Sequence, residues 1–161
     1  MLNKKAMIKN VELILEYVAL TLRSNRFKYQ LFENEKENKI TISLISNIDE
    51  LLLEKINTST SIIEFKNSES NANHYSDKIN KYLDSSVKEF NQIKLMLDNI
   101  NGLDYTFKYI LIKGVLLNDS IIEICRKLNI GKSTYYHRLH EAKFMLSLSI
   151  PECYRLDKLN K

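Results

Sequence analysis

Residues 120–146 read SIIEICRKLNIGKSTYYHRLHEAKFML, a pattern that predicts two helices separated by one tight turn. Ser120 can cap the first helix, and Glu123, three residues later, can reach back to the backbone N–H of the cap. Apolar residues recur at helical spacing on one face of this helix, which should end near Leu128. These residues are Ile121, Ile124 and Leu128.

The segment Asn129-Ile130-Gly131 interrupts the helical pattern. Asn and Gly both tolerate the left-handed backbone conformation that ends helices, so we expect the turn here. A second helix should start near Lys132 and continue to Leu146, with Leu139 and Ala142 at helical spacing before it. Two short helices joined in this way form a helix-turn-helix, whose second helix lies in the major groove of DNA.

The interior and outward positions of this motif differ in character. Cys125 is small and falls where the two helices approach closely, while Ile130 can fill the turn. Tyr135 and Leu139 should point back into the domain. The outward residues are polar or combine a ring with a donor or acceptor, as contacts with bases and phosphates require. They are Lys132, Ser133, Tyr136, His137 and His140.

Residues spread over both helices carry a family resemblance. They are Glu123-Ile124-Cys125, Leu128, Ile130, Ser133-Thr134, Arg138-Leu139-His140 and Ala142. This set resembles the helix-turn-helix of sigma factor region four, where the pattern is Glu-Ile-Ala, Leu-Gly-Ile, a Thr-Val pair and Arg-Leu-His-x-Ala. Cys125 replaces the usual Ala and Asn129 the usual Gly. Tyr135 replaces the usual Val, which puts a large ring at a core position.

Nothing upstream of the motif resembles the promoter-melting region of a sigma factor, so a complete sigma factor is not expected. The chain length, the helix before the motif and the run of residues 133–136, Ser-Thr-Tyr-Tyr, are more similar to the ArpU-type phage transcriptional regulators. That family, with the RinA-like activators, switches on late phage genes for packaging and lysis. The resemblance therefore implies a DNA-binding activator of late genes, with double-stranded DNA as its partner.

The residues expected to contact DNA form two groups. Those expected to face bases are Lys132, Ser133, Tyr136 and His137. Those expected nearer the phosphates are Arg138, His140 and Lys143, with Ser120 and Asn118 donating from the start of the first helix. Phosphate contacts would supply affinity and salt dependence, and base contacts would supply sequence choice.

The positive charge of the chain is unevenly distributed. From Asp104 onward there are ten Lys or Arg and six Asp or Glu, whereas residues 1–103 hold fourteen of each. The whole net charge of +4 therefore belongs to the segment with the helix-turn-helix. This is the distribution expected when one end of a protein meets a polyanion.

The N-terminal segment predicts a long helix from Lys4 to about Arg23. Its apolar residues repeat at alternating spacings of four and three, which favours either a helix packed inside its own domain or a dimerisation helix. These residues are Met7, Val11, Ile14, Val18 and Leu22. A second copy of the chain, on two DNA half-sites, and RNA polymerase are the further partners considered.

The region between the two ends is less regular. Residues 26–39 should continue the helix or form a loop, and residues 39–44 alternate like a strand but have no clear partner. Asp49 to Ile56 indicates a helix. With only 3 Gly and 1 Pro, extended β architecture is not expected, so the predicted class is all-α.

The predicted organisation has three parts. Residues 1–66 form an N-terminal helical region for oligomerisation or partner binding, and the polar stretch 67–76 is a linker. Residues 77–161 form the C-terminal DNA-binding domain, with a helix expected from Asp77 to about Ile100 and another from Tyr105 to Lys113. Gly114 should provide the turn before the motif, and a charged tail follows Pro151.

Other chemistry is not indicated by the sequence. Gly131-Lys132-Ser133 resembles the end of a phosphate-binding loop, but Arg126 stands where its first glycine belongs. His137 and His140 lack the further ligands of a zinc site, and no catalytic dyad or carboxylate pair is present. Neither an enzyme, a cofactor nor a metal is expected.

The cysteine content and the lack of a long apolar run indicate a cytoplasmic protein with free thiols. The two cysteines are Cys125, which is expected to be buried, and Cys153.

Two alternative functions fit the same sequence features. A small terminase subunit also carries a helix-turn-helix but assembles into rings for DNA packaging. A helical adaptor of RNA polymerase would use the helix pair without touching DNA. Oligomer size and DNA retention distinguish these alternatives from a transcriptional regulator.

Overall fold

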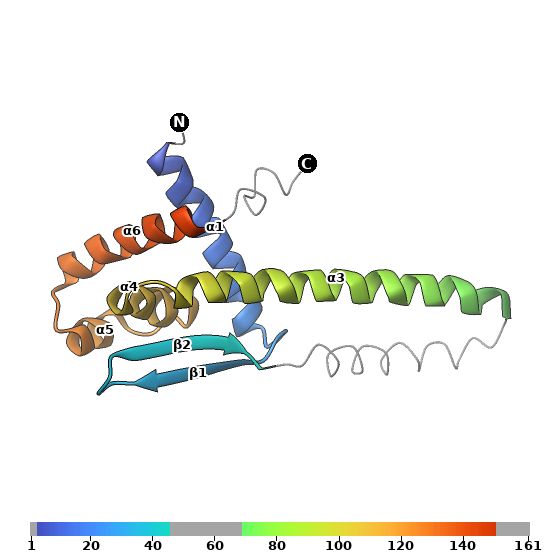
Figure 1. The fold of residues 1–161 in the computed structure, drawn as a ribbon, viewed down its shortest axis with the longest axis horizontal. Coiled ribbons are helices and arrows are strands. Elements are labelled where there is room, and N and C mark those ends of the chain that lie inside the picture. Colours follow the sequence, from blue (N-terminus) through green and yellow to red (C-terminus); the bar gives the residue numbers. More distant parts are fainter. Residues whose placement is uncertain (1–2, 46–68, 151–161) are drawn as a thin grey trace.

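The structure is a computed structural model that describes residues 3–45 and 69–150, with only the backbone described for residues 69–84. This part of the chain is mostly helical, which confirms the helical class (Figure 1). In chain order its elements are α1 (Lys4–Arg23), β1 (Tyr29–Asn34), β2 (Lys39–Leu44), α3 (Glu69–Asn101), α4 (Tyr105–Tyr109), the π-helix η1 (Ile110–Leu116), α5 (Ile121–Leu128) and α6 (Lys132–Ser149). The predicted helix Asp49–Ile56, Cys153 and the C-terminal tail lie outside the described residues.

Helix α1 packs inside the molecule along the stripe that the sequence predicts. Val11, Ile14, Val18 and Leu22 are all buried. The helix contacts α6 and η1, so the N-terminal and C-terminal parts of the chain lie against each other. Of the two uses expected for the stripe, packing within the domain is the one that this structure has.

The strands β1 and β2 form an antiparallel hairpin, a small sheet within a chain that is mostly helical as expected. The register pairs Tyr29 with Leu44 at one end and Asn34 with Lys39 at the other. The side chain of Asn101 bonds to the opposite edge of β2. Its Oδ1 accepts from the backbone N–H of Ile42 at 3.0 Å, and its Nδ2 donates to the carbonyl of the same residue at 2.7 Å. The strand thus pairs with β1 on one side and with α3 on the other.

Helix α3 begins within the stretch expected to be a polar linker, since residues 69–76 are helical. Residues 67 and 68 lie outside the described part. The C-terminal half of α3 lies beside β2, and its N-terminal half projects away from the other described elements (Figure 1). Residues before and after the expected linker share one core. Its largest fully buried side chains include Leu15, Leu22, Phe27, Ile40, Ile42, Ile93, Leu97, Ile100, Ile110, Leu111, Ile112 and Leu116.

Gly114 lies inside η1 and does not form the turn that the sequence predicts there. A Cβ atom at this position would come closer than 3.0 Å to the hydroxyl of Tyr135, so the glycine leaves space for that ring. The last carbonyls of the π-helix are satisfied by α1: Arg23 donates to Val115 and Leu116 at 3.0 and 3.2 Å. Helix α6 packs against this π-helix.

Candidate nucleic-acid interface

Helix α5 begins where the sequence predicts, with Ser120 as its N-cap in extended conformation. Its side chain makes no capping hydrogen bond, so the predicted reciprocal bonds between Ser120 and Glu123 are wrong. The chain enters the helix through Asn118, which has a left-handed φ of 57°. Both Asn118 and Ser120 are exposed at the start of α5, the end at which DNA contacts were expected.

The turn between α5 and α6 depends on Asn129. This residue is left-handed, with φ 55° and ψ 48°, and the N–H of Ile130 bonds to the carbonyl of Cys125 at 3.0 Å. Gly131 is extended instead, with φ −80°, and serves as the N-cap of α6. Only one of the two residues expected to adopt the left-handed conformation therefore does so. Cys125 is partly buried, not fully buried as expected.

The inner face of α6 carries the residues that the sequence assigned to it. Tyr135, Ala142 and Leu146 are buried, and Leu139 is partly buried against the core. The Tyr135 ring fits because Gly114 faces its hydroxyl, which explains how a residue larger than valine is accommodated at this position. Burial raises the pKa of Tyr135 above its ordinary value, so its hydroxyl stays neutral in the core.

The outer face of α6 is polar and open to solvent from Lys132 to His140, whereas Met145 and Leu148 expose apolar side chains nearer its C-terminal end. The exposed residues of the polar part are Lys132, Ser133, Thr134, Tyr136, His137, Arg138 and His140. Tyr136 is 49% exposed, and its ring meets that of Tyr135 edge to face at a centroid distance of 5.3 Å. This contact ties an exposed aromatic side chain to a buried one and limits its movement.

Two of the outward side chains contact one carboxylate. His137 Nε2 lies 2.7 Å from Glu141 Oε1, and Arg138 lies 3.7 Å from the other carboxylate oxygen of Glu141. Both contacts are within one helix and largely exposed, so they orient the side chains without removing them from solvent. Six of the nine residues predicted from the sequence thus lie together on the outer face of α6.

Lys143 differs from the other predicted contact residues. Its ammonium lies 3.2 Å from Glu12 of α1, and only 19% of its side chain is exposed. This ion pair fastens α6 to α1. Another cation–ring contact joins the same two helices, since Lys4 Nζ lies 4.5 Å from the centroid of the Phe144 ring.

Glu33 of β1 joins the β-hairpin to α5 and η1. Its carboxylate bonds to Lys127 of α5 at 2.7 Å and to Lys113 of η1 at 3.1 Å. Lys127 also bonds to Glu35. Burial raises the pKa of Glu33, but the hydrogen bonds from Lys127 and Lys113 outweigh it and hold this pKa below the ordinary value. The hydrogen bonds that Lys127 donates to the carboxylates of Glu33 and Glu35 raise the pKa of Lys127.

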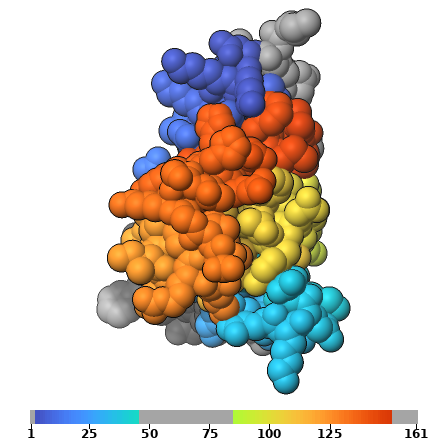
Figure 2. Space-filling model, turned by 90° about the vertical axis from the view of Figure 1, so that its left-hand side faces the viewer, coloured from blue at the N-terminus to red at the C-terminus, as the bar shows by residue number. Residues whose placement is uncertain are grey.

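Sequence reasoning missed one basic element of this surface. Figure 2 shows the face that carries α5 and α6, and the beginning of α1 adjoins α6 on the same face. Lys4, Lys5 and Lys9 line one groove there with His140, although more than a hundred residues separate them from α6 in the sequence. Because residues 1–103 have no net charge, counting by segment conceals this local excess.

Other kinds of site are not formed by the described residues. In residues 3–45 and 69–150, no three His, Cys, Asp or Glu side chains gather in a way that could hold a metal ion. No helix in the same ranges has the length and apolar character needed to cross a bilayer. Comparison with family models, curated proteins and solved structures gave no match to this chain.

Proposed function

We propose that this protein is a sequence-specific DNA-binding regulator of transcription, in which α6 enters the major groove. One observation carries the proposal. The helix pair buries the side chains that hold it together and exposes hydrogen-bonding residues between Lys132 and His140 on the other side of α6. An α-helix with exposed polar residues in its first turns fits the dimensions of the major groove.

The assignment of bases and phosphates follows the positions along α6. Lys132, Ser133, Tyr136 and His137 belong to its first turns, where recognition helices contact base edges. Arg138 and His140 come next and are placed to reach phosphates. Lys143 takes a structural role, because its ion pair with Glu12 keeps it against α1.

The target of the regulator is proposed from the resemblance to ArpU-type regulators. On that basis its binding site lies upstream of late genes of a phage or mobile element, and it activates them. The partners are double-stranded DNA and RNA polymerase. A second copy of the chain would extend the sequence that is read, since one helix-turn-helix covers a single half-site.

The first test is to incubate the purified protein with genome fragments at moderate salt and sequence the retained DNA. Enrichment of a discrete site supports the proposal. Uniform weak retention by a ring of many subunits would replace it with a packaging function. Absence of retention would favour an adaptor that binds protein.

The second test removes the proposed reading side chains with Tyr136→Ala and His137→Ala. Both are exposed, so the fold should persist while discrimination between sites falls by roughly 10-fold to 100-fold per lost base contact. The matched control is Phe32→Ala with Gln30→Ala on β1, which removes an exposed aromatic and an exposed polar side chain elsewhere. Unchanged site selection by the first double variant would refute the assignment of the reading face.

A further inference from the structure

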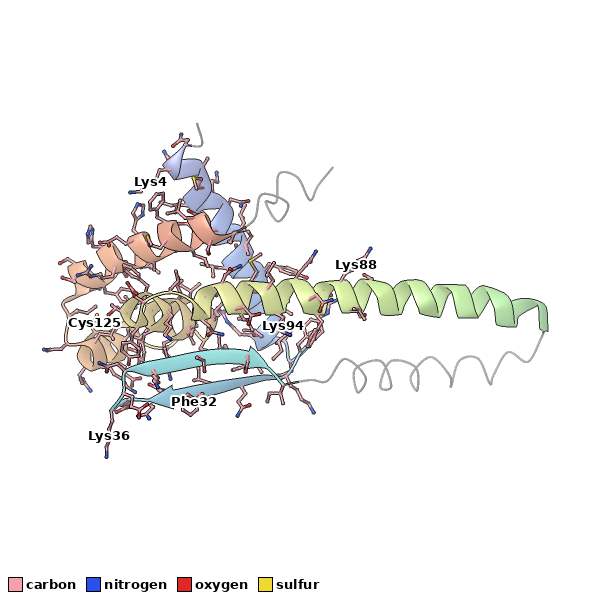
Figure 3. All side chains as sticks on the ribbon, in the orientation of Figure 1. Lys4, Phe32, Lys36, Lys88, Lys94 and Cys125 are labelled. Atoms are coloured by element: carbon pink, nitrogen blue, oxygen red, sulfur yellow. The ribbon has the colours of Figure 1, made fainter. Side chains whose placement is uncertain are left out.

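A groove of about 570 Å³ lies between the start of α1 and the outer side of α6. Its lining is dominated by cationic side chains of α1 and includes one residue of α6 from the proposed reading face. The lining residues are Asn3, Lys4, Lys5, Ile8, Lys9, Glu12 and His140. Figure 3 labels Lys4 at this end of α1, near α6.

The groove carries more uncompensated positive charge than its lining residues alone suggest. Its one carboxylate, Glu12, is engaged by Lys143, which lies outside the groove lining. Lys4 is held over the Phe144 ring, which keeps the start of α1 close to α6. Lys5 and Lys9 are exposed, and neither has an ion-pair partner within residues 3–45 and 85–150. Two cations are therefore available to an anionic ligand.

The spacing of these two lysines suits an extended anion. Residues four apart lie one turn apart on the same side of a helix, about 6 Å along its axis. Two flexible ammonium groups at this separation can engage neighbouring charges of one polyanionic strand. His140 lies on the α6 side of the same groove, so a duplex in contact with α6 would continue past the start of α1.

We propose that this groove is a second contact site for the DNA backbone, in which Lys5 and Lys9 bind phosphates of the duplex read by α6. This inference rests on the proposed function. It assigns to α1 a role beyond packing: α6 selects the sequence, and α1 supplies salt-sensitive affinity and fixes the orientation of the duplex across the domain.

The experiment compares two charge-neutralising double variants of the full chain. Lys5→Gln/Lys9→Gln removes the proposed contacts. Lys88→Gln/Lys94→Gln removes two exposed charges from α3, away from the helix pair (Figure 3). The affinity for the retained site is measured from low to high salt, with thermal melting as a check on the fold. The slope of log K against log salt should fall by about 1.8 for Lys5→Gln/Lys9→Gln, which corresponds to a loss on the order of 50-fold near 0.1 M salt. The α3 variant should keep the wild-type slope.

Two further readouts sharpen the assignment. Lys5→Arg/Lys9→Arg preserves charge and should restore the wild-type slope. The ranking of DNA sites should be the same for the wild type and Lys5→Gln/Lys9→Gln, because phosphate contacts carry no direct sequence information. A changed ranking would mean that α1 reads bases and would overturn the phosphate assignment.

The outcomes separate this inference from the proposed function. Equal slopes for the α1 and α3 variants, with site selection by the wild type intact, overturn the second contact site alone. A wild-type protein that retains no duplex DNA overturns both.

Discussion

The start of α1 and the tip of the β-hairpin flank the same helix pair but use their charges differently. At the start of α1, Lys5 and Lys9 are exposed, and the nearby Glu12 is engaged by Lys143. Around the hairpin tip, Glu33 and Glu35 bond to cations of α5 and η1. The α1 flank therefore presents to solvent cations that are unpaired within the described part of the chain, whereas the charges of Glu33 and Glu35 at the hairpin flank form ion pairs within the protein.

We expect this difference to separate DNA binding from stability: the α1 flank would serve binding and the hairpin flank would serve stability. A charge already paired inside the protein gains little from a ligand, whereas an exposed cation attracts a polyanion. The hairpin tip also mixes signs, since Lys39 pairs with Glu37 at 3.1 Å. We expect mutations at the α1 flank to change DNA affinity and mutations at the hairpin flank to change stability.

The largest expected effect comes from reversing charge at each flank in turn. Lys5→Glu/Lys9→Glu should weaken DNA binding on the order of 1000-fold at low salt, because two attractions become repulsions. Lys36→Glu/Lys39→Glu on the hairpin should change it by less than about threefold, since distant exposed charges are screened. Fluorescence anisotropy with a labelled duplex measures both. Similar losses at the two flanks would remove the distinction between them.

The next effect concerns the packing of α6 against the π-helix η1. Gly114→Ala should destabilise the protein by about 2–3 kcal/mol, because the added methyl overlaps the Tyr135 hydroxyl. Tyr135→Phe in the same chain should recover much of the loss by removing that hydroxyl. Urea unfolding of the single and double variants measures the coupling.

Gly131 provides the matched control, because a Cβ there has no neighbour within 4 Å among the described atoms. Gly131→Ser should be neutral or slightly stabilising, since serine is a good N-cap. If Gly114→Ala were as stable as the wild type, the packing between Gly114 and the Tyr135 ring would have room for a methyl group.

A smaller effect is expected at the hairpin flank. Glu33→Gln should lower the free energy of unfolding by about 1–2 kcal/mol, because it removes a charged partner of Lys113 and Lys127. Glu37→Gln, which breaks an exposed pair, should cost less than about 0.5 kcal/mol. The two variants are compared by urea unfolding, and neither should change DNA affinity at a temperature where both are folded. Equal losses of stability for Glu33→Gln and Glu37→Gln would mean that the ion pairs of Glu33 stabilise the protein no more than an exposed pair.

The smallest expected effect is the pH dependence of the stabilisation that Glu33 provides through Lys113 and Lys127. Because the folded-state pKa of Glu33 is lowered, its contribution is present above the ordinary glutamate pKa of about 4.3 and is lost as pH falls through the folded value. The pKa of Lys127 is raised, so its contribution persists up to its ordinary pKa of 10.5. The stability gap between wild type and Glu33→Gln should be constant from about pH 5 to 9 and should narrow as the pH falls below the ordinary glutamate pKa. A gap that does not narrow on acidification would mean that Glu33 acts through packing.

The sequence predicts the helix pair well because its signals are local. Ser120, Asn129 and Gly131 mark the ends of α5 and α6 within a few residues of the backbone they control. The inward residues of α6 follow from helical spacing alone. The predicted DNA contacts depend on the same spacing and stay a prediction, apart from the finding that Lys143 is paired with Glu12.

Most features that sequence reasoning missed depend on residues far apart in the chain. The partner strand β1 is an exception, since it lies directly before β2. The other edge of β2 bonds to Asn101, 59 residues after Ile42, which no local pattern reveals. Gly114 was interpreted as a turn because its real neighbour, Tyr135, is in another helix. The lysines at the start of α1 join the surface of α6 only through the packing of these two helices.

The bond between Asn101 and β2 also bears on aggregation. Exposed strand edges recruit strands from other molecules, which is a common route to domain swapping and fibril growth. At the middle of β2, both the donor and the acceptor of Ile42 are occupied by one amide side chain from α3. A neighbouring chain can add a strand at this edge only by displacing Asn101, so this residue blocks strand addition at the middle of β2.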